Sequence, residues 1–177
     1  MAEPLKNQFG VDIPRRIATA IASVHEPFAV QPFIADALQG YDALDLMARG
    51  RAIADALQRH LPAKYQTALR ILLKSVGKPG QSPPAAGMAS FFYLPHVLFV
   101  ARHGLDHFEA SMRAQYLLTQ HFTAEFSIRP FLERYPQQTL AQLALWARDP
   151  NVHVRRLVSE GTRPRLPWAP RLRQFQQ

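Results

Sequence analysis

Apolar residues recur three and four positions apart along almost the whole chain, and no segment alternates apolar with polar residues as a half-buried strand would. This spacing places apolar side chains on one face of an α-helix. It predicts helices over 14–24, 32–40, 43–61, 64–76, 88–102, 106–117, 123–132, 139–147 and 152–160. The predicted fold class is therefore all-α.

Prolines, glycines and hydroxyl residues mark where several of these helices begin, bend and end. Pro95 interrupts the apolar segment 88–102, which predicts a kink or a break there. We expect Thr139 to cap the start of its helix and Gly161 to end the last helix in a left-handed conformation. The stretch 77–87 is dense in glycine and proline and predicts a flexible surface loop, with a linker between subdomains as the alternative. The helical pattern continues on both sides of this loop, so we expect a single domain over 1–177.

The turn Asp149-Pro150-Asn151 leads one short helix directly back into the next. Paired short helices with Asp in the turn and Val-Arg early in the second helix are typical of HEAT-type repeats. The periods here are irregular, so the pattern suggests internal repetition without demonstrating it. Stacked antiparallel pairs would form a curved solenoid, whose concave side makes a trough that a nucleic-acid duplex could occupy.

Composition restricts the compartment and the chemistry. Hydrophobic residues make up 47% of the 177 residues, which is enough for a buried core. The chain has no cysteine, which excludes disulfides, thiolate metal sites and cysteine nucleophiles. No apolar run is long enough to span a bilayer, and the first residues lack the apolar core of a secretion signal. These features predict a soluble cytoplasmic protein with no membrane partner.

The net charge of +8 is concentrated near the C-terminus. Seven arginines and two acidic residues lie from residue 148 onward, so this stretch supplies five of the eight positive charges. Arginine binds phosphate oxygens with two parallel hydrogen bonds and stacks on bases, so the bias favours nucleic acid as the partner. A basic solvated surface without a partner is the competing interpretation.

The segment from residue 149 to residue 168 separates apolar from polar side chains. Val154, Leu157 and Val158 fall on the helix face that packs inward. A carboxylate, several guanidiniums and an aromatic ring then share one exposed edge, which suits DNA that carries a damaged base. The residues on that edge are His153, Arg156, Glu160, Arg163, Arg165 and Trp168.

Three segments of the chain resemble the AlkC branch of the bacterial HEAT-like DNA alkylation-repair glycosylases. They are AEPLKN at 2–7, LTQHFTAEFSIRPFL at 118–132 and DPNVHVRRLVSEGTRPRLPWA at 149–169. The last segment is the most specific, and the three together extend from residue 2 to residue 169. Members of this family excise N3-alkylated purines such as 3-methyladenine from double-stranded DNA, without a metal or another cofactor, on a concave helical surface.

The resemblance implies roles for individual residues. Glu125 and Glu160 would be the active-site carboxylates, with Glu160 the stronger candidate because its motif is the more specific. Arg156 and Trp168 match motif positions that line the same cleft. We add Arg129, His153, Arg163 and Arg165 to the DNA-binding residues. The chemistry agrees, because alkylation at N3 makes the purine a cationic leaving group, and carboxylates can stabilise the oxocarbenium-like sugar and position a water.

Each of these residues also has a less specific interpretation. Glu125 could simply favour the dipole of a helix start. Arg156 and Glu160 are four residues apart and could form an ordinary surface ion pair. Trp168 could cover a hydrophobic cluster. At the level of the whole chain, the alternatives are a non-catalytic DNA-binding solenoid and a protein–protein scaffold.

The chain also departs from the family pattern at its C-terminal end. Family members continue into further repeats, with a motif like Val-Arg-x-Ser-Val-Ala-Asn that is absent here. The tail after residue 168 carries Leu172 and Phe175 but is too short for another helix pair. We therefore expect an apolar side of the last pair to lack a neighbour, which predicts self-association or pairing with a separate C-terminal half, and weak excision by this chain alone.

Overall fold

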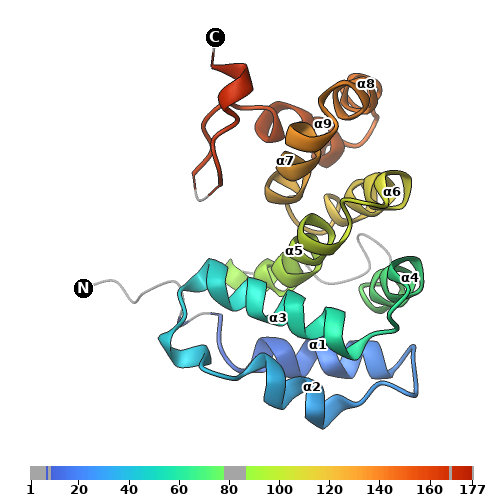
Figure 1. Cartoon of the computed structure of the whole chain (residues 1–177), viewed down its shortest axis with the longest axis vertical. Helices are drawn as coiled ribbons and strands as arrows, with labels where there is room; N and C mark the ends of the chain where they lie inside the picture. Colours follow the sequence, from blue (N-terminus) through green and yellow to red (C-terminus); the bar gives the residue numbers. More distant parts are fainter. Residues whose placement is uncertain (1–6, 8, 78–86, 168, 177) are drawn as a thin grey trace.

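The computed structural model describes residues 7, 9–77, 87–167 and 169–176 of the chain (Figure 1). Within these residues the structure is helical and contains no strand, which confirms the all-α prediction. The α-helices are α1 (Asp12–Ala22), α2 (Val30–Ala37), α3 (Leu46–His60), α4 (Tyr65–Ser75), α5 (Leu94–His103), α6 (Phe108–Leu118), α7 (Glu125–Arg134), α8 (Pro136–Trp146) and α9 (Val152–Gly161). Three 3-10 helices are η2 (Tyr41–Ala43), η3 (Gly87–Tyr93) and η4 (Arg173–Phe175).

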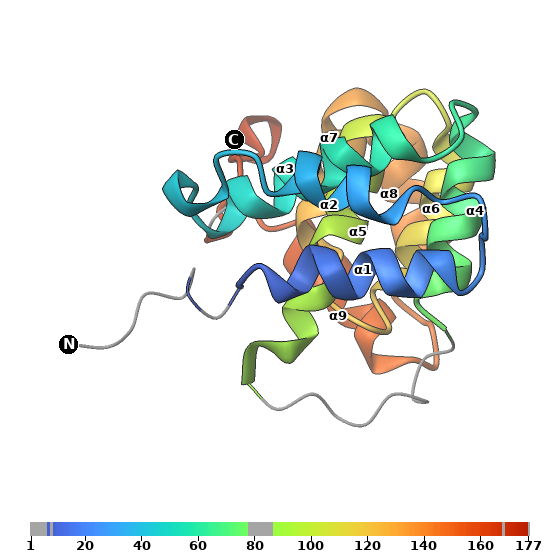
Figure 2. The same ribbon diagram turned by 90° about the horizontal axis from the view of Figure 1, so that it is seen from below.

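The helices stack in two rows along the long axis of the molecule. Helices α2, α3, α5, α7 and α9 contact one another in succession, while α1 packs on α4 and α4 on α6. Helix α8 packs on α7 and α9 at the C-terminal end. Figure 2 shows the opposite end, where α1 and α2 lie side by side. This stack of short helix pairs is the solenoid that the sequence predicts.

Helix α5 forms the centre of the stack because it packs between α3 and α7. Every residue from Leu94 to Ala101 is buried. Pro95 lies in the first turn of α5, where a missing backbone N–H breaks no intrahelical hydrogen bond. The predicted segment 88–102 is therefore broken at this point into η3 and α5, and does not continue as one kinked helix.

The roles predicted for two residues at helix ends are wrong. Thr139 does not cap α8, which begins at Pro136; its side chain is buried and donates a hydrogen bond of 2.9 Å to the carbonyl of Phe131. Gly161 is the last residue of α9 and does not have a positive φ. A Cβ on Gly161 would lie 2.7 Å from Cγ2 of Ile128, so glycine is needed for the close approach of α9 to α7.

The C-terminal tail packs back on the solenoid. Leu172 is fully buried, and Phe175 packs against the core. The tail therefore buries apolar residues of its own, whereas Leu140 and Leu145 of α8 remain exposed. The predicted loop 77–87 falls mostly on residues 78–86, which lie outside the described residues. Within the described part of the chain, no helix combines the length and apolar character needed to cross a membrane.

Candidate active site

The turn before α9 is built by side-chain hydrogen bonds. The carboxylate of Asp149 accepts hydrogen bonds from the backbone N–H of Asn151 at 2.8 Å and from the hydroxyl of Tyr116 at 3.0 Å. The side chain of Asn151 caps α9 by accepting from the N–H of His153 at 2.8 Å. Val154 and Leu157 then pack inward, as predicted, which leaves the polar face of α9 exposed.

Glu125 is a buried carboxylate at the first residue of α7. Only 5% of the residue is exposed, and its backbone N–H donates to Oγ1 of Thr123 at 3.3 Å. Its Oε1 lies 3.2 Å from Nη2 of Arg156, whose own side chain is largely exposed on α9. A buried carboxylate needs compensation for lost hydration, which the guanidinium and the positive end of the α7 dipole provide here.

Glu125 and Arg156 lie in the wall of a cavity of about 370 Å³. The lining includes Phe91 and Phe122, whose rings meet nearly edge to face with their centres 5.2 Å apart. It also includes Glu125 and Arg156, which carry the carboxylate and the guanidinium. The complete lining is Ser90, Phe91, Thr119, Gln120, His121, Phe122, Thr123, Glu125, Phe126, His153, Arg156 and Leu157. A planar ring with positive charge would find both an aromatic face and a carboxylate here.

The aromatic residues that line the cavity were not predicted from the sequence. Phe122 and Phe126 lie inside the segment 118–132 that carries the family resemblance, but Phe91 comes from η3, far away in the sequence. His121 also lines the cavity without having been predicted, and burial lowers the pKa of its imidazole. The sequence feature that could have indicated this aromatic lining is the run of three aromatic residues at 91–93. In the structure Phe91 packs against Phe122 and Tyr93 packs against His121, both in the stretch after α6.

Glu160 lies outside this cavity. Its carboxylate pairs with Arg163, with Nη1 of the arginine 3.0 Å from Oε2. Arg156 and Glu160 therefore have different partners and do not form the surface ion pair that was the alternative interpretation, because Arg156 turns toward Glu125. Of the predicted site residues, the structure brings Glu125, Arg156 and His153 together and leaves Glu160 on the neighbouring surface.

Arg129 is buried beneath the surface on which it was expected. The residue is 1% exposed, and its guanidinium donates to the backbone carbonyls of Gly161, Arg163, Pro164 and Pro170. This placement corrects the expectation of direct DNA contact, because a guanidinium that is buried and bonded to carbonyls cannot also bind phosphate.

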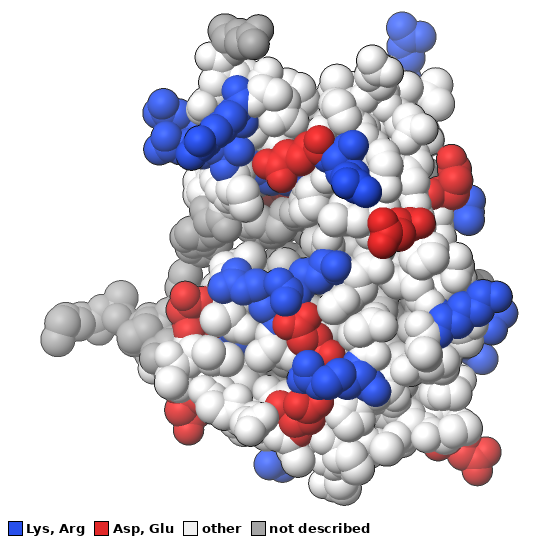
Figure 3. All heavy atoms as spheres, viewed as in Figure 1, with Lys and Arg blue, Asp and Glu red and all other residues white. Residues whose placement is uncertain are grey.

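The arginines from residue 148 onward are on the surface, and blue side chains, here all arginine, gather over the C-terminal end of the chain (Figure 3). The exposed ones are Arg148, Arg155, Arg156, Arg163, Arg165, Arg171 and Arg173. Trp168, predicted to line the cleft, lies outside the described residues. Within the ranges that the structure describes, no three histidine, aspartate or glutamate side chains are grouped so that they could hold a metal ion.

Comparison with known proteins places this geometry in a family. No protein-family model matches the chain. The uncharacterized protein YhaZ of Bacillus subtilis (strain 168) is 38% identical over 131 residues, which cover 74% of this chain and 34% of YhaZ. The alkylpurine DNA glycosylase AlkC of Pseudomonas fluorescens, solved bound to DNA containing an abasic site analog, is 36% identical with a TM-score of 0.88. That match covers 98% of this chain and 46% of the AlkC chain, so this chain spans about half the length of AlkC and about a third of YhaZ. Over 98% of its length the chain is therefore similar to AlkC, in agreement with the branch that its sequence resembles.

Proposed function

We propose that this chain acts in a DNA glycosylase that removes N3-alkylated purines, such as 3-methyladenine, from duplex DNA. The observation that carries this proposal is the buried Glu125 carboxylate in the wall of a partly aromatic cavity, beside a surface of exposed arginines. The AlkC match supports it, because that protein is an alkylpurine DNA glycosylase and was solved bound to DNA containing an abasic site analog.

The reaction needs charge stabilisation more than acid catalysis. The bond between C1′ and N9 of an N3-methyladenine nucleotide breaks, and N9 keeps the electron pair, so the cationic base leaves as neutral 3-methyladenine. Positive charge develops on the sugar at the same time. A water then adds to C1′ and loses its proton to a carboxylate.

Glu125 suits both roles. Its side chain is mostly removed from water, which strengthens its interaction with a developing cation. Arg156 forms an ion pair with the carboxylate, and the rings of Phe91 and Phe122 offer an aromatic face to the cationic base. We keep Glu160 as the second candidate carboxylate, acting from the surface of α9.

DNA would be held by the exposed arginines of the C-terminal third. Their guanidiniums are accessible to solvent and can bind phosphates without regard to sequence. This binding would place the damaged nucleotide near α9, where His153 and Arg156 join the arginine surface to the cavity.

Base release from methylated duplex DNA tests the proposal. The chain is incubated with DNA that contains 3-methyladenine, and the free base is measured by chromatography, with unmethylated duplex as the control. Release above the spontaneous rate supports the glycosylase. Tight, salt-sensitive DNA binding without release would instead indicate the non-catalytic DNA-binding solenoid. Absence of any preference for DNA would favour a protein–protein scaffold.

A further inference from the structure

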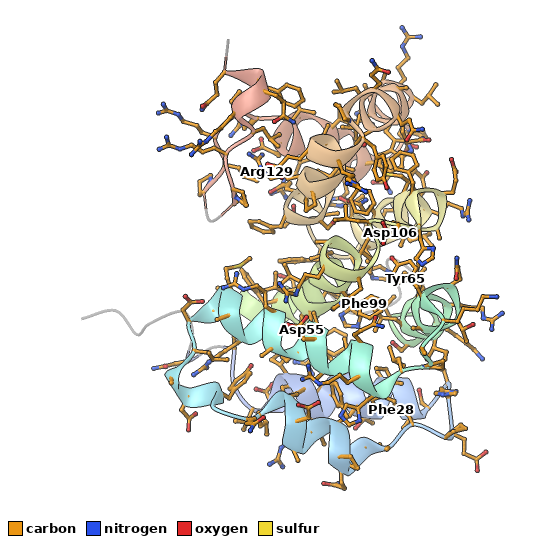
Figure 4. The ribbon with its side chains drawn as sticks, in the orientation of Figure 1. Phe28, Asp55, Tyr65, Phe99, Asp106 and Arg129 are labelled. Atoms are coloured by element: carbon orange, nitrogen blue, oxygen red, sulfur yellow. The ribbon has the colours of Figure 1, made fainter. Side chains whose placement is uncertain are left out.

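Arg129 connects α7 to a stretch of chain that has no regular structure. Its Nε donates to the carbonyl of Pro170 at 2.8 Å, and Nη1 donates to the carbonyls of Arg163 at 2.8 Å and Gly161 at 3.2 Å. Nη2 donates to the carbonyl of Pro164 at 3.3 Å. Gly161 is the last residue of α9, the other three acceptors belong to the stretch that follows it, and Figure 4 shows Arg129 on α7 beside this stretch. We call residues 162–167 and 169–172 the C-terminal loop.

The C-terminal loop needs an external donor because of its own sequence. Pro164, Pro167 and Pro170 lack a backbone N–H, so the loop cannot satisfy its carbonyls through a helix or a ladder. A guanidinium offers five N–H donors in a rigid planar fork, and Arg129 uses it to bind carbonyls that lie on different sides of the loop. The carbonyl of Gly161 is at the negative end of α9, which adds a favourable dipole interaction.

Hydrogen bonds and a buried leucine also hold the C-terminal end of the loop. The N–H of Leu172 donates to the carbonyl of Pro164 at 3.1 Å, which closes the loop on itself. The side chain of Leu172 is fully buried, and Nε2 of Gln174 donates to the carbonyl of Leu132 at 3.2 Å. Arg129 is the buried polar group inside this closed loop.

The loop carries exposed arginines on its outer side. Arg163 and Arg165 are exposed, and Arg163 also pairs with Glu160 of α9. When the backbone that carries these arginines is already fixed, binding a ligand through them costs less conformational entropy.

We propose that Arg129 is a positioning residue for DNA binding: it holds the backbone of the C-terminal loop so that Arg163 and Arg165 face the phosphates in a fixed arrangement. This inference rests on the proposed function. It differs from a direct contact, because Arg129 touches no phosphate and acts through the four carbonyls.

Substitution by lysine separates positioning from charge. Arg129→Lys keeps the positive charge but loses the planar fork, since one ammonium group cannot reach the four carbonyls together. We expect Arg129→Lys and Arg129→Met each to weaken binding of a short duplex by about tenfold, measured by fluorescence anisotropy on protein shown by circular dichroism to be folded. We also expect amide hydrogen exchange to accelerate at residues 163–172 and to stay unchanged in α3 and α5.

Arg49 is the matched control at the other end of the solenoid. It is also buried, at 6% exposure, and also donates to backbone carbonyls, those of Phe9 and Tyr41. Arg49→Lys and Arg49→Met should lower the free energy of unfolding without changing DNA affinity or exchange in the C-terminal loop. Equal loss of DNA affinity in the Arg49 and Arg129 variants would reduce Arg129 to a general stabilising role and overturn the proposal.

Two further outcomes are decisive. Wild-type affinity and wild-type loop exchange in Arg129→Lys would show that the fork is not needed, which contradicts the proposal. If the wild-type chain fails to bind DNA, the proposed function is wrong, and exchange at residues 163–172 in Arg129→Lys still decides whether Arg129 holds the loop.

Discussion

Oε1 of Glu125 lies 3.2 Å from Nη2 of Arg156, and this ion pair joins the first turn of α7 to the exposed face of α9. The two residues are 31 positions apart, so the contact exists only because α7 and α9 pack together. It places a buried negative charge at the edge of the cavity and gives α9 a direct connection to it. A carboxylate that is shielded from water interacts more strongly with a developing positive charge than an exposed one does.

Glu125→Gln should reduce base excision by about 10²- to 10³-fold while leaving DNA affinity nearly unchanged, because the amide keeps the shape and removes the charge. Glu160→Gln should also reduce excision if that residue is the second carboxylate. Single-turnover release of 3-methyladenine gives the rate, and anisotropy gives the affinity. Excision at the wild-type rate in both variants would show that neither residue is catalytic.

Arg163→Ala combined with Arg165→Ala should flatten the plot of log affinity for duplex DNA against log salt concentration, by about one unit of slope for each phosphate that the variant no longer binds. Titrations at several salt concentrations measure this slope. Arg59→Ala combined with Arg102→Ala is the control, because these arginines are already paired with Asp36 and Asp55. In Figure 3 blue and red spheres adjoin over the lower half of the molecule, and Figure 1 shows there α2 and α3, which carry Asp36, Asp55 and Arg59. A slope that changes only in the control would place the DNA-binding surface there.

His96 should make the fold sensitive to acid. It is fully buried in α5, and burial lowers the pKa of His96 to about 3 from its ordinary value of 6.5. The folded chain therefore keeps this imidazole neutral at pH 5, whereas the unfolded chain protonates it. Stability is present above pH 6.5 and is lost as the pH falls toward 3, by about 2 kcal/mol between pH 7 and pH 5.

The variant His96→Met isolates this contribution, because methionine has a similar volume and does not titrate. Urea unfolding at pH 7 and pH 5 should show a pH-dependent loss of free energy that is about 2 kcal/mol smaller in the variant than in the wild type. His121 also has a pKa lowered by burial, so some loss should remain in the variant. An identical loss in both proteins would mean that His96 does not titrate on unfolding.

Leu145 should promote self-association. It is 71% exposed on α8, on the same helix as the exposed Leu140, and burying a leucine side chain stabilises an interface by about 1.5–3 kcal/mol. We expect sedimentation velocity to show a concentration-dependent dimer that Leu145→Lys weakens at least about tenfold. Val11→Lys, at an exposed apolar position on the opposite end of the molecule, should have no such effect. A chain that stays monomeric at all concentrations would contradict this prediction.

Helix identity and the inward faces could be predicted from the sequence because both depend on local spacing. Val154 and Leu157 are buried as their positions in the pattern require, and the hydrogen bonds of Asp149 and Asn151 form within a few residues. The ends of helices were less predictable, because Thr139 and Gly161 could each have capped a helix. Packing between helices gave them other roles: Thr139 bonds to the carbonyl of Phe131, and Gly161 allows α9 to approach α7 closely.

The sequence by itself determined the helices, the positive charge near the C-terminus and the residues that resemble a family. Only the tertiary structure decided their contacts. Their spacing allowed Arg156 to pair with Glu160, and Arg129 was expected among the DNA-binding residues, but the packing of α7 on α9 turns Arg156 toward Glu125 and buries Arg129 under the C-terminal loop. Phe91 reaches the cavity wall from a distant segment in the same way. A side chain's partner depends on which helices meet in space, and that is decided by burial of the whole core rather than by neighbours along the chain.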